Sequence, residues 1–176
     1  YILNKYDVDG DGRISGEEAE KVTTIKYAGK GLKSFDNFLF FRNIADLDLS
    51  DNELTSIDLG SFAHSLKNLN LSGNNIKELS IDGAINIETL YISNNAMENL
   101  EGMMGTNMTK IKWIDASNNR LKTFRCSYNT SLTYANLSNN ELTVCDLDGC
   151  SNLSELYVSH NQLTNETNSL VRPYTW

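Results

Sequence analysis

The chain has 176 residues, with 15 lysines and arginines against 23 aspartates and glutamates, so its formal net charge is −8. This charge excludes the basic surface that a nucleic acid or an anionic membrane requires of its partner. No apolar run is long enough to cross a bilayer, and the length suits one domain with a substantial core. Because the chain opens at Tyr1 rather than at Met, we expect it to be processed or truncated.

Residues 7–18 read Asp-Val-Asp-Gly-Asp-Gly-Arg-Ile-Ser-Gly-Glu-Glu, which matches the EF-hand calcium loop. Such a loop binds Ca²⁺ through carboxylates at positions 1, 3 and 5, a carbonyl at 7, position 9 and a bidentate Glu at 12. The expected ligands are Asp7, Asp9, Asp11, Arg13, Ser15 and Glu18. Carboxylates this close repel one another without a cation, so the alternative of an Asp/Gly turn that binds nothing is the weaker interpretation.

The segments that flank this loop fit helices, over residues 1–6 and 16–22. Calcium sensors pair two such hands, whereas one is visible here. We therefore expect residues 1–21 to form an EF-hand-like helix–loop–helix cap. Its calcium would be structural, and the cap would cover the open edge of the body that follows.

From residue 44 onwards the pattern L-x-x-L-x-L-S-x-N-x-L recurs with conservative substitutions. Its asparagines are 22, 21, 24, 21 and 21 residues apart, a period typical of leucine-rich repeats. One repeat cannot bury its apolar edge alone, so the repeats must stack. The sequence predicts an α/β repeat fold over residues 22–163: a right-handed solenoid of about seven turns, with a concave parallel sheet and irregular or 3-10 convex segments.

The recurring asparagines are expected to form a structural ladder, because a carboxamide can pair backbone groups at the bend of each adjacent repeat. They are Asn52, Asn74, Asn95, Asn119, Asn140 and Asn161. An additional first turn carries Lys30 in the asparagine slot. The longest interval contains an insertion at residues 101–106, which we expect to bulge on the convex side or its edge. Residues 164–176 are expected to form a tail or an incomplete cap.

Three cysteines are present, and their odd number favours free thiols. Cys126 and Cys145 occupy core columns that other repeats fill with Leu, Ile or Phe, where a thiol acts as a small apolar residue. Cys150 falls on a turn. If a disulfide forms, Cys145 and Cys150 are the pair closest in sequence.

The outward residues of the predicted strands form columns on the concave surface. The candidate ligand-binding residues in these columns are Tyr91, Trp113, Asp115, Tyr134, Asn136 and Tyr157. Tyrosine and tryptophan are enriched at recognition hot spots, although they also stabilise sheets by cross-strand contacts. Asp46, Asp48, Asp115 and Glu155 favour a partner with basic or hydroxyl-rich groups.

Enzyme signatures are absent from the sequence, which lacks a Gly-rich phosphate loop, a paired-Cys zinc site and a G-x-S-x-G motif. His64 and His160 fall on linking segments or turns, and the repeated serines fit crowded strand ends. We therefore expect no enzymatic activity and no catalytic residues.

The strings Asn-Glu-Leu-Thr-x-x-Asp-Leu and Leu-Asp-Gly-Cys-Ser-Asn-Leu, found within residues 140–153, resemble those of secreted or surface-anchored leucine-rich repeat proteins of gut-dwelling Gram-negative bacteria. The resemblance implies a module that is secreted or held at the bacterial cell surface, directly or through a lipid anchor. It also implies recognition of a protein partner, as in the internalins, although this chain lacks their regular proline after the Asn motif. The alternatives are carbohydrate binding or adhesion, and a spacer for a domain that this chain does not include.

Overall fold

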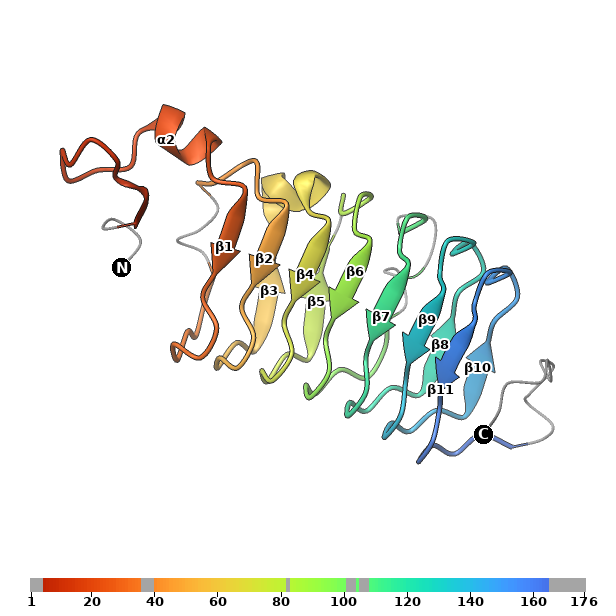
Figure 1. Ribbon diagram of the computed structural model, residues 1–176. Helices are drawn as coiled ribbons and strands as arrows, with labels where there is room; N and C mark the ends of the chain where they lie inside the picture. The colour runs from red at the N-terminus through yellow and green to blue at the C-terminus, as the bar shows by residue number, and fades with distance from the viewer. Residues whose placement is uncertain (1–4, 36–39, 82, 101–103, 105–107, 165–176) are drawn as a thin grey trace.

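The repeats stack along one axis in the computed structural model, with β1 and β11 at opposite ends of an elongated body (Figure 1). The structure describes residues 5–35, 40–81, 83–100, 104 and 108–164. Within these ranges, no helix is long and apolar enough to span a membrane.

One face of the solenoid is a parallel sheet of seven strands in chain order. The register places equivalent residues of successive repeats opposite each other, as Leu47 opposite Leu69. Six turns separate these seven strands, where the sequence predicts about seven turns. The strands are β1 (Thr24–Lys26), β2 (Asp46–Asp48), β4 (Asn68–Asn70), β6 (Thr89–Tyr91), β7 (Trp113–Asp115), β9 (Tyr134–Asn136) and β11 (Glu155–Tyr157).

The convex side differs from the irregular or 3-10 segments expected for it. Only one 3-10 helix is found among the described residues, η2 (Gly60–Ser65). Two further pairs of parallel strands lie behind the main sheet (Figure 1): β3 (Ser56–Asp58) with β5 (Glu78–Ser80), and β8 (Thr123–Arg125) with β10 (Val144–Asp146). Apolar residues alternate there with exposed ones, and this is the period of a half-buried strand. The insertion expected at residues 101–106 lies outside the described residues except at Met104.

The core runs continuously between the two faces, because each repeat covers the apolar edge of the one before it. The central residue of each strand in the main sheet is almost completely buried from β1 to β9, from Ile25 at 1 % exposure to Ala135 at 0 %. At the last strand, Leu156 is only half-buried. The last strand has a neighbouring strand on one side only, whereas the N-terminal segment with the buried Ala19 precedes β1.

The ladder asparagines join each repeat to the preceding one. Asn140 is representative: its Oδ1 accepts the backbone N–H of Leu121 at 3.0 Å, and its Nδ2 donates to the carbonyls of Ala116 and Leu137, both at 3.0 Å. Asn74, Asn95, Asn119 and Asn161 make the same set of bonds. Each carboxamide thus pairs backbone groups of two repeats at once.

A left-handed residue stands immediately before each ladder asparagine. Its φ is between 55° and 57° at five of these positions and 70° at Gly73. Besides Gly73, the residues at this slot are Asp51, Asn94, Asn118, Asn139 and His160. Aspartate, asparagine, histidine and glycine tolerate this region best among the amino acids, so the residue types at this slot follow from the bend.

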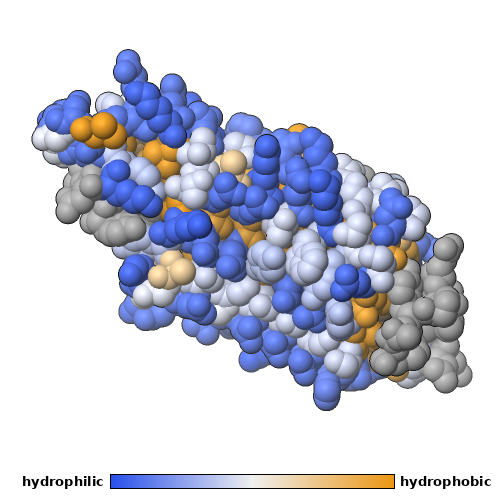
Figure 2. All heavy atoms as spheres, in the orientation of Figure 1, coloured by the Kyte–Doolittle hydropathy of each residue, from blue (hydrophilic) through white to orange (hydrophobic). Residues whose placement is uncertain are grey.

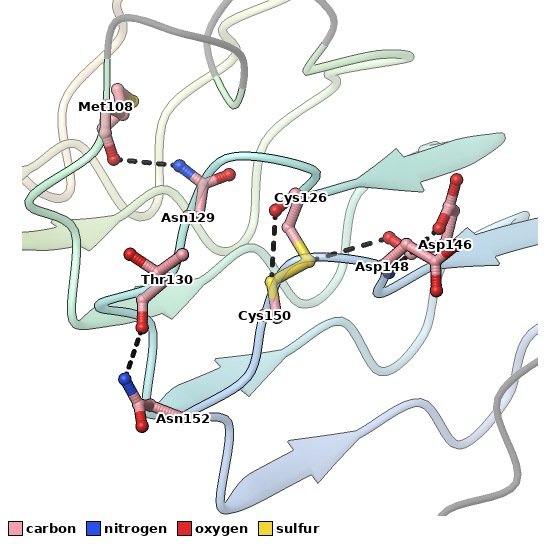
Figure 3. The surroundings of a disulfide bond; sticks show 8 residues. All are labelled: Met108, Cys126, Asn129, Thr130, Asp146, Asp148, Cys150 and Asn152. Carbon is pink, nitrogen blue, oxygen red and sulfur yellow. Dashed lines mark hydrogen bonds between the residues drawn. A yellow bond between two sulfur atoms is a disulfide. The ribbon is translucent and has the colours of Figure 1, made fainter.

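The cysteines correct the expectation of free thiols. Cys126 and Cys150 form a disulfide with their Cα atoms 6.1 Å apart, joining two stacked turns (Figure 3). Their separation of 24 residues is close to one repeat, so stacking brings them together even though Cys145 lies nearer to Cys150 in the sequence. Gly149 assists the approach, because a Cβ at this position would collide with the carbonyl oxygen of Ser127.

The remaining thiol, Cys145, is buried, and this burial together with the nearby charge of Asp146 raises its pKa to about 12. We expect a thiol reagent to detect one thiol per chain in denaturant without reductant, and three after reduction. Three thiols without reductant would contradict the disulfide. Reduction should also lower the free energy of unfolding by about 2–4 kcal/mol, since a loop of this length then gains freedom in the unfolded chain.

Candidate functional site

Two columns of outward side chains run along the concave face, as the strand register requires. The first is Thr24, Asp46, Asn68, Thr89, Trp113, Tyr134 and Glu155; the second is Lys26, Asp48, Asn70, Tyr91, Asp115, Asn136 and Tyr157. Neighbours within a column are roughly 4.8 Å apart, the spacing of paired strands. All six candidate concave residues therefore lie on one surface of β6, β7, β9 and β11.

Four aromatic residues of these columns, Tyr91, Trp113, Tyr134 and Tyr157, define the aromatic patch. The rings of Trp113 and Tyr134 stack with centroids 3.6 Å apart and an interplanar angle of 5°. Tyr157 lies against Tyr134 at 5.6 Å and 44°. Trp113 and Tyr91 nevertheless remain 37 % exposed and Tyr157 49 %. The rings of Trp113, Tyr134 and Tyr157 thus contact one another across strands, and the patch also faces solvent.

Polar side chains that accept hydrogen bonds from neighbouring serines lie next to the aromatic patch. The Oδ1 of Asp115 accepts the backbone N–H of Ser117 at 3.0 Å and its hydroxyl at 2.7 Å. Asn136 occupies the same place in its own repeat and accepts the backbone N–H of Ser138 at 3.2 Å. Burial raises the pKa of Tyr134, and the negative charges of Asp115 and Glu155 add to this effect. The carboxylates of Asp115 and Glu155 therefore lie next to the patch in the columns.

A hollow of about 460 Å³ adjoins the patch on the side of the earlier repeats. Its lining is Thr24, Ile25, Lys26, Asp46, Leu47, Asp48, Asn68, Leu69, Asn70 and Tyr91. The Nδ2 of Asn68 donates a hydrogen bond to Asp46 at 2.5 Å, and the hydroxyl of Ser50 donates one to Asp48 at 2.7 Å. The side of the molecule seen in Figure 2 is mainly hydrophilic or intermediate, with hydrophobic residues confined to small areas.

At the N-terminal end, carboxylate oxygens of Asp7, Asp9 and Asp11 lie within 4.8 Å of one another. Asp7 accepts the backbone N–H groups of Gly10 at 2.7 Å and Gly12 at 2.9 Å. Both glycines have positive φ, 76° and 84°, which side chains rarely adopt. The loop therefore turns sharply and brings its three aspartates together.

Glu18 reaches back to the start of the same loop. Its Oε1 accepts the backbone N–H of Val8 at 2.6 Å, and its Oε2 accepts that of Ser15 at 2.8 Å. These bonds, with that from Ser15 the strongest, lower the pKa of Glu18 to about 2. Ser15 is the N-cap of α2 (Gly16–Glu20) and forms a capping box with Glu18. The carboxylate of Glu18 thus bonds the backbone of the loop and does not belong to the cluster of Asp7, Asp9 and Asp11.

The N-terminal segment packs on the first repeat. The hydroxyl of Tyr6 donates to the carbonyl of Thr24 at 3.1 Å, and its ring meets Phe41 edge-on at 5.3 Å. Ala19 of α2 is buried in the core. Of the two expected helices, the second is present but shorter than residues 16–22, while residues 1–4 of the first lie outside the described ranges.

Comparison with known proteins identifies the repeats. The family model described as Leucine Rich Repeat matches residues 65–84. Human oligodendrocyte-myelin glycoprotein is 30 % identical over 130 residues, which are 70 % of this chain and 29 % of that protein. Rat lumican is 28 % identical over 131 residues, covering 72 % and 38 % respectively. The chain thus spans about a third of the length of these curated relatives.

Solved structures agree on the fold. The functional domain of InlJ from Listeria monocytogenes, which includes a cysteine ladder, superposes with a TM-score of 0.71 at 18 % identity, covering 86 % of this chain and 38 % of that one. Internalin C2 from the same organism gives 0.61 at 21 %, covering 90 % and 81 %. Such identities show the fold alone. The chain therefore has the leucine-rich repeat fold, and residues 65–84 match the family model of the repeat itself.

Proposed function

We propose that this chain is a non-enzymatic extracellular binding module that recognises a protein partner through its concave face. The aromatic patch carries the proposal. Trp113 stays more than a third exposed although its ring is already stacked on Tyr134. Tyrosine and tryptophan offer large rigid contact area at low entropic cost, which is why they dominate recognition hot spots.

A carbohydrate partner gains less support from the same geometry. A sugar stacks on an open ring face, and the facing sides of Trp113 and Tyr134 are 3.6 Å apart and occupied by each other, so only the outer sides of the pair are open to a ligand. The adjoining hollow instead suits a protruding loop of a protein, since polar side chains of successive repeats line it.

The test compares the immobilised chain with a double variant, Trp113→Ala with Tyr134→Ala, in capture of extracellular proteins identified by mass spectrometry. We expect a protein retained by the wild type to be reduced at least about tenfold on the variant, because hot-spot truncations cost roughly 2 kcal/mol or more. Tyr128→Ala is the matched control, since Tyr128 is 59 % exposed on a turn outside the sheet. Equal retention by both variants, or capture only of glycans on a glycan array, would overturn the proposal.

We further propose that the loop at residues 7–18 binds Ca²⁺ as a structural ion. The donor set supports it: three aspartate carboxylates converge, Glu18 bonds the backbone of the same loop, and Ca²⁺ prefers six to eight oxygen ligands. Arg13 would contribute its backbone carbonyl, and Ser15 stands at the position that acts through a water. The ion would neutralise the loop that connects Tyr6 to α2, and so tie this cap to the first repeat.

We propose that the protein is secreted or displayed on a bacterial cell surface. The disulfide between Cys126 and Cys150 supports an oxidising compartment, because cytosolic thiols are kept reduced. The bacterial source rests on the resemblance of the repeat strings, and the fold is shared with proteins of Listeria monocytogenes and Leptospira interrogans.

A further inference from the structure

We propose that the concave face binds a guanidinium group, presented by an arginine of the protein partner, on the side of Trp113 turned away from Tyr134. The inference rests on the proposed recognition of a protein through this face. It adds the chemistry of one contact and its place: the junction between the aromatic patch and the hollow.

The stacking determines which side of the indole is available. Tyr134 follows Trp113 in the first column and lies parallel to it, so the opposite side of the indole is turned towards β6. The residue of that column on β6 is Thr89, opposite Trp113 in the register. A threonine side chain is too small to cover an indole, in keeping with the 37 % exposure of Trp113.

A carboxylate stands beside this ring. Asp115 is two residues further along β7, so it projects from the same side of the sheet as Trp113. Its Oδ1 accepts both bonds from Ser117, while Oδ2 accepts none from the residues that the structure describes. Tyr91 is opposite Asp115 in the register and also lines the hollow. The register therefore places the indole of Trp113, the carboxylate of Asp115 and the ring of Tyr91 on neighbouring positions of one surface, and Tyr91 is the one of the three that lines the hollow.

Arginine suits this arrangement better than lysine does. A guanidinium is planar and weakly hydrated, stacks on an aromatic face, and can at the same time donate to a carboxylate. A lysine ammonium is a strongly hydrated point charge without that planar fork. Glu155, beyond Tyr134 in the same column, adds negative charge to the patch. The nearest lysine in sequence, Lys112, is already paired with Glu88 at 2.6 Å.

The test uses N-acetyl-arginine amide as the probe and the indole Nε1–H signal of Trp113 as the readout, in ¹H–¹⁵N spectra of the Trp176→Phe variant, which keeps a single tryptophan. We expect a saturable shift of this signal. N-acetyl-citrulline amide, a neutral analogue of the same shape, should bind at least about tenfold more weakly, and the lysine derivative several-fold more weakly. Equal binding of arginine and citrulline would overturn the proposal.

Two substitutions locate the site. Asp115→Asn should weaken arginine binding about three- to tenfold with little change to the fold, because Asn70 and Asn136 occupy the same place in other repeats and accept the same serine N–H. Thr89→Tyr should remove binding by covering the indole, since this column already holds large rings at Trp113 and Tyr134.

Asp48→Asn is the matched control. Asp48 occupies the same place on β2, bonded to Ser50 as Asp115 is to Ser117, but with no aromatic residue beside it in the columns. We expect it to leave arginine binding unchanged. An equal loss in Asp48→Asn and Asp115→Asn would show general attraction to acidic groups and would overturn the proposal.

The outcomes also separate this inference from the function on which it rests. If the arginine probe does not shift the indole signal, while the double variant of Trp113 and Tyr134 still loses its protein partner, the arginine site is wrong and recognition through the concave face stands. If the probe binds as expected but the double variant retains its partner, the proposed function is wrong, and the arginine site has no part in protein recognition.

Discussion

Replacing Asn140 by alanine is expected to lower the free energy of unfolding by about 3–5 kcal/mol, because buried backbone groups then lose their partners at roughly 1–3 kcal/mol each. Asn140 is 8 % exposed, and its carboxamide accepts from Leu121 and donates to the carbonyls of Ala116 and Leu137. An alanine replaces none of these bonds, and water has little access to the bend. Chemical unfolding followed by circular dichroism measures the change.

Asn161→Ala is the matched control for this substitution. Asn161 makes the equivalent bonds to Leu142, Leu137 and Val158, but it belongs to the last described repeat and its surroundings are partly exposed. Water can therefore replace part of what is lost, and we expect a loss of about 1 kcal/mol. Equal losses at both positions would mean that the ladder does not act through burial of backbone groups.

The main sheet could be predicted from the sequence because its cause is local and repeated. Each strand places one apolar residue inward, such as Leu47 or Leu69, and each bend needs a left-handed residue followed by an asparagine. Both requirements recur at the repeat period, so the pattern predicts the columns of the concave face as well. For the same reason, the aromatic residues could be assigned to one surface before their rings were placed.

Features that depend on the packing of side chains and turns between adjacent repeats could not be predicted from this pattern. The disulfide joins Cys126 to Cys150 because two turns approach closely at Gly149, which linear spacing does not reveal. The parallel stacking of Trp113 on Tyr134 is a matter of side-chain rotation, and the column assignment leaves this open. The hollow beside Tyr91 is lined by side chains of three earlier strands, and its shape depends on their rotation as well.

Removal of calcium is expected to lower the melting temperature by about 5–10 °C. An ion that binds only the folded chain stabilises it by about 2.7 kcal/mol when its free concentration is a hundred times its Kd. For a domain of this size each kcal/mol corresponds to roughly 2–4 °C. Differential scanning calorimetry in millimolar Ca²⁺ and then in excess EGTA measures the shift, and isothermal titration calorimetry of the stripped chain measures binding.

Two substitutions of aspartate by asparagine separate a specific site from the general effect of charge. Asp7→Asn removes one charge from the position that opens the loop, and it should abolish most of the calcium-dependent shift in melting temperature. Asp148→Asn makes the same change in an exposed turn of the later repeats and should leave the shift intact. The proposed ion acts on the cap, where Tyr6 and Ala19 contact the first repeat, so the amide hydrogens of α2 and β1 should exchange faster in EGTA while those of β9 do not. An unchanged melting temperature in EGTA, together with no heat of calcium binding, would show that the three aspartates form a turn without a metal.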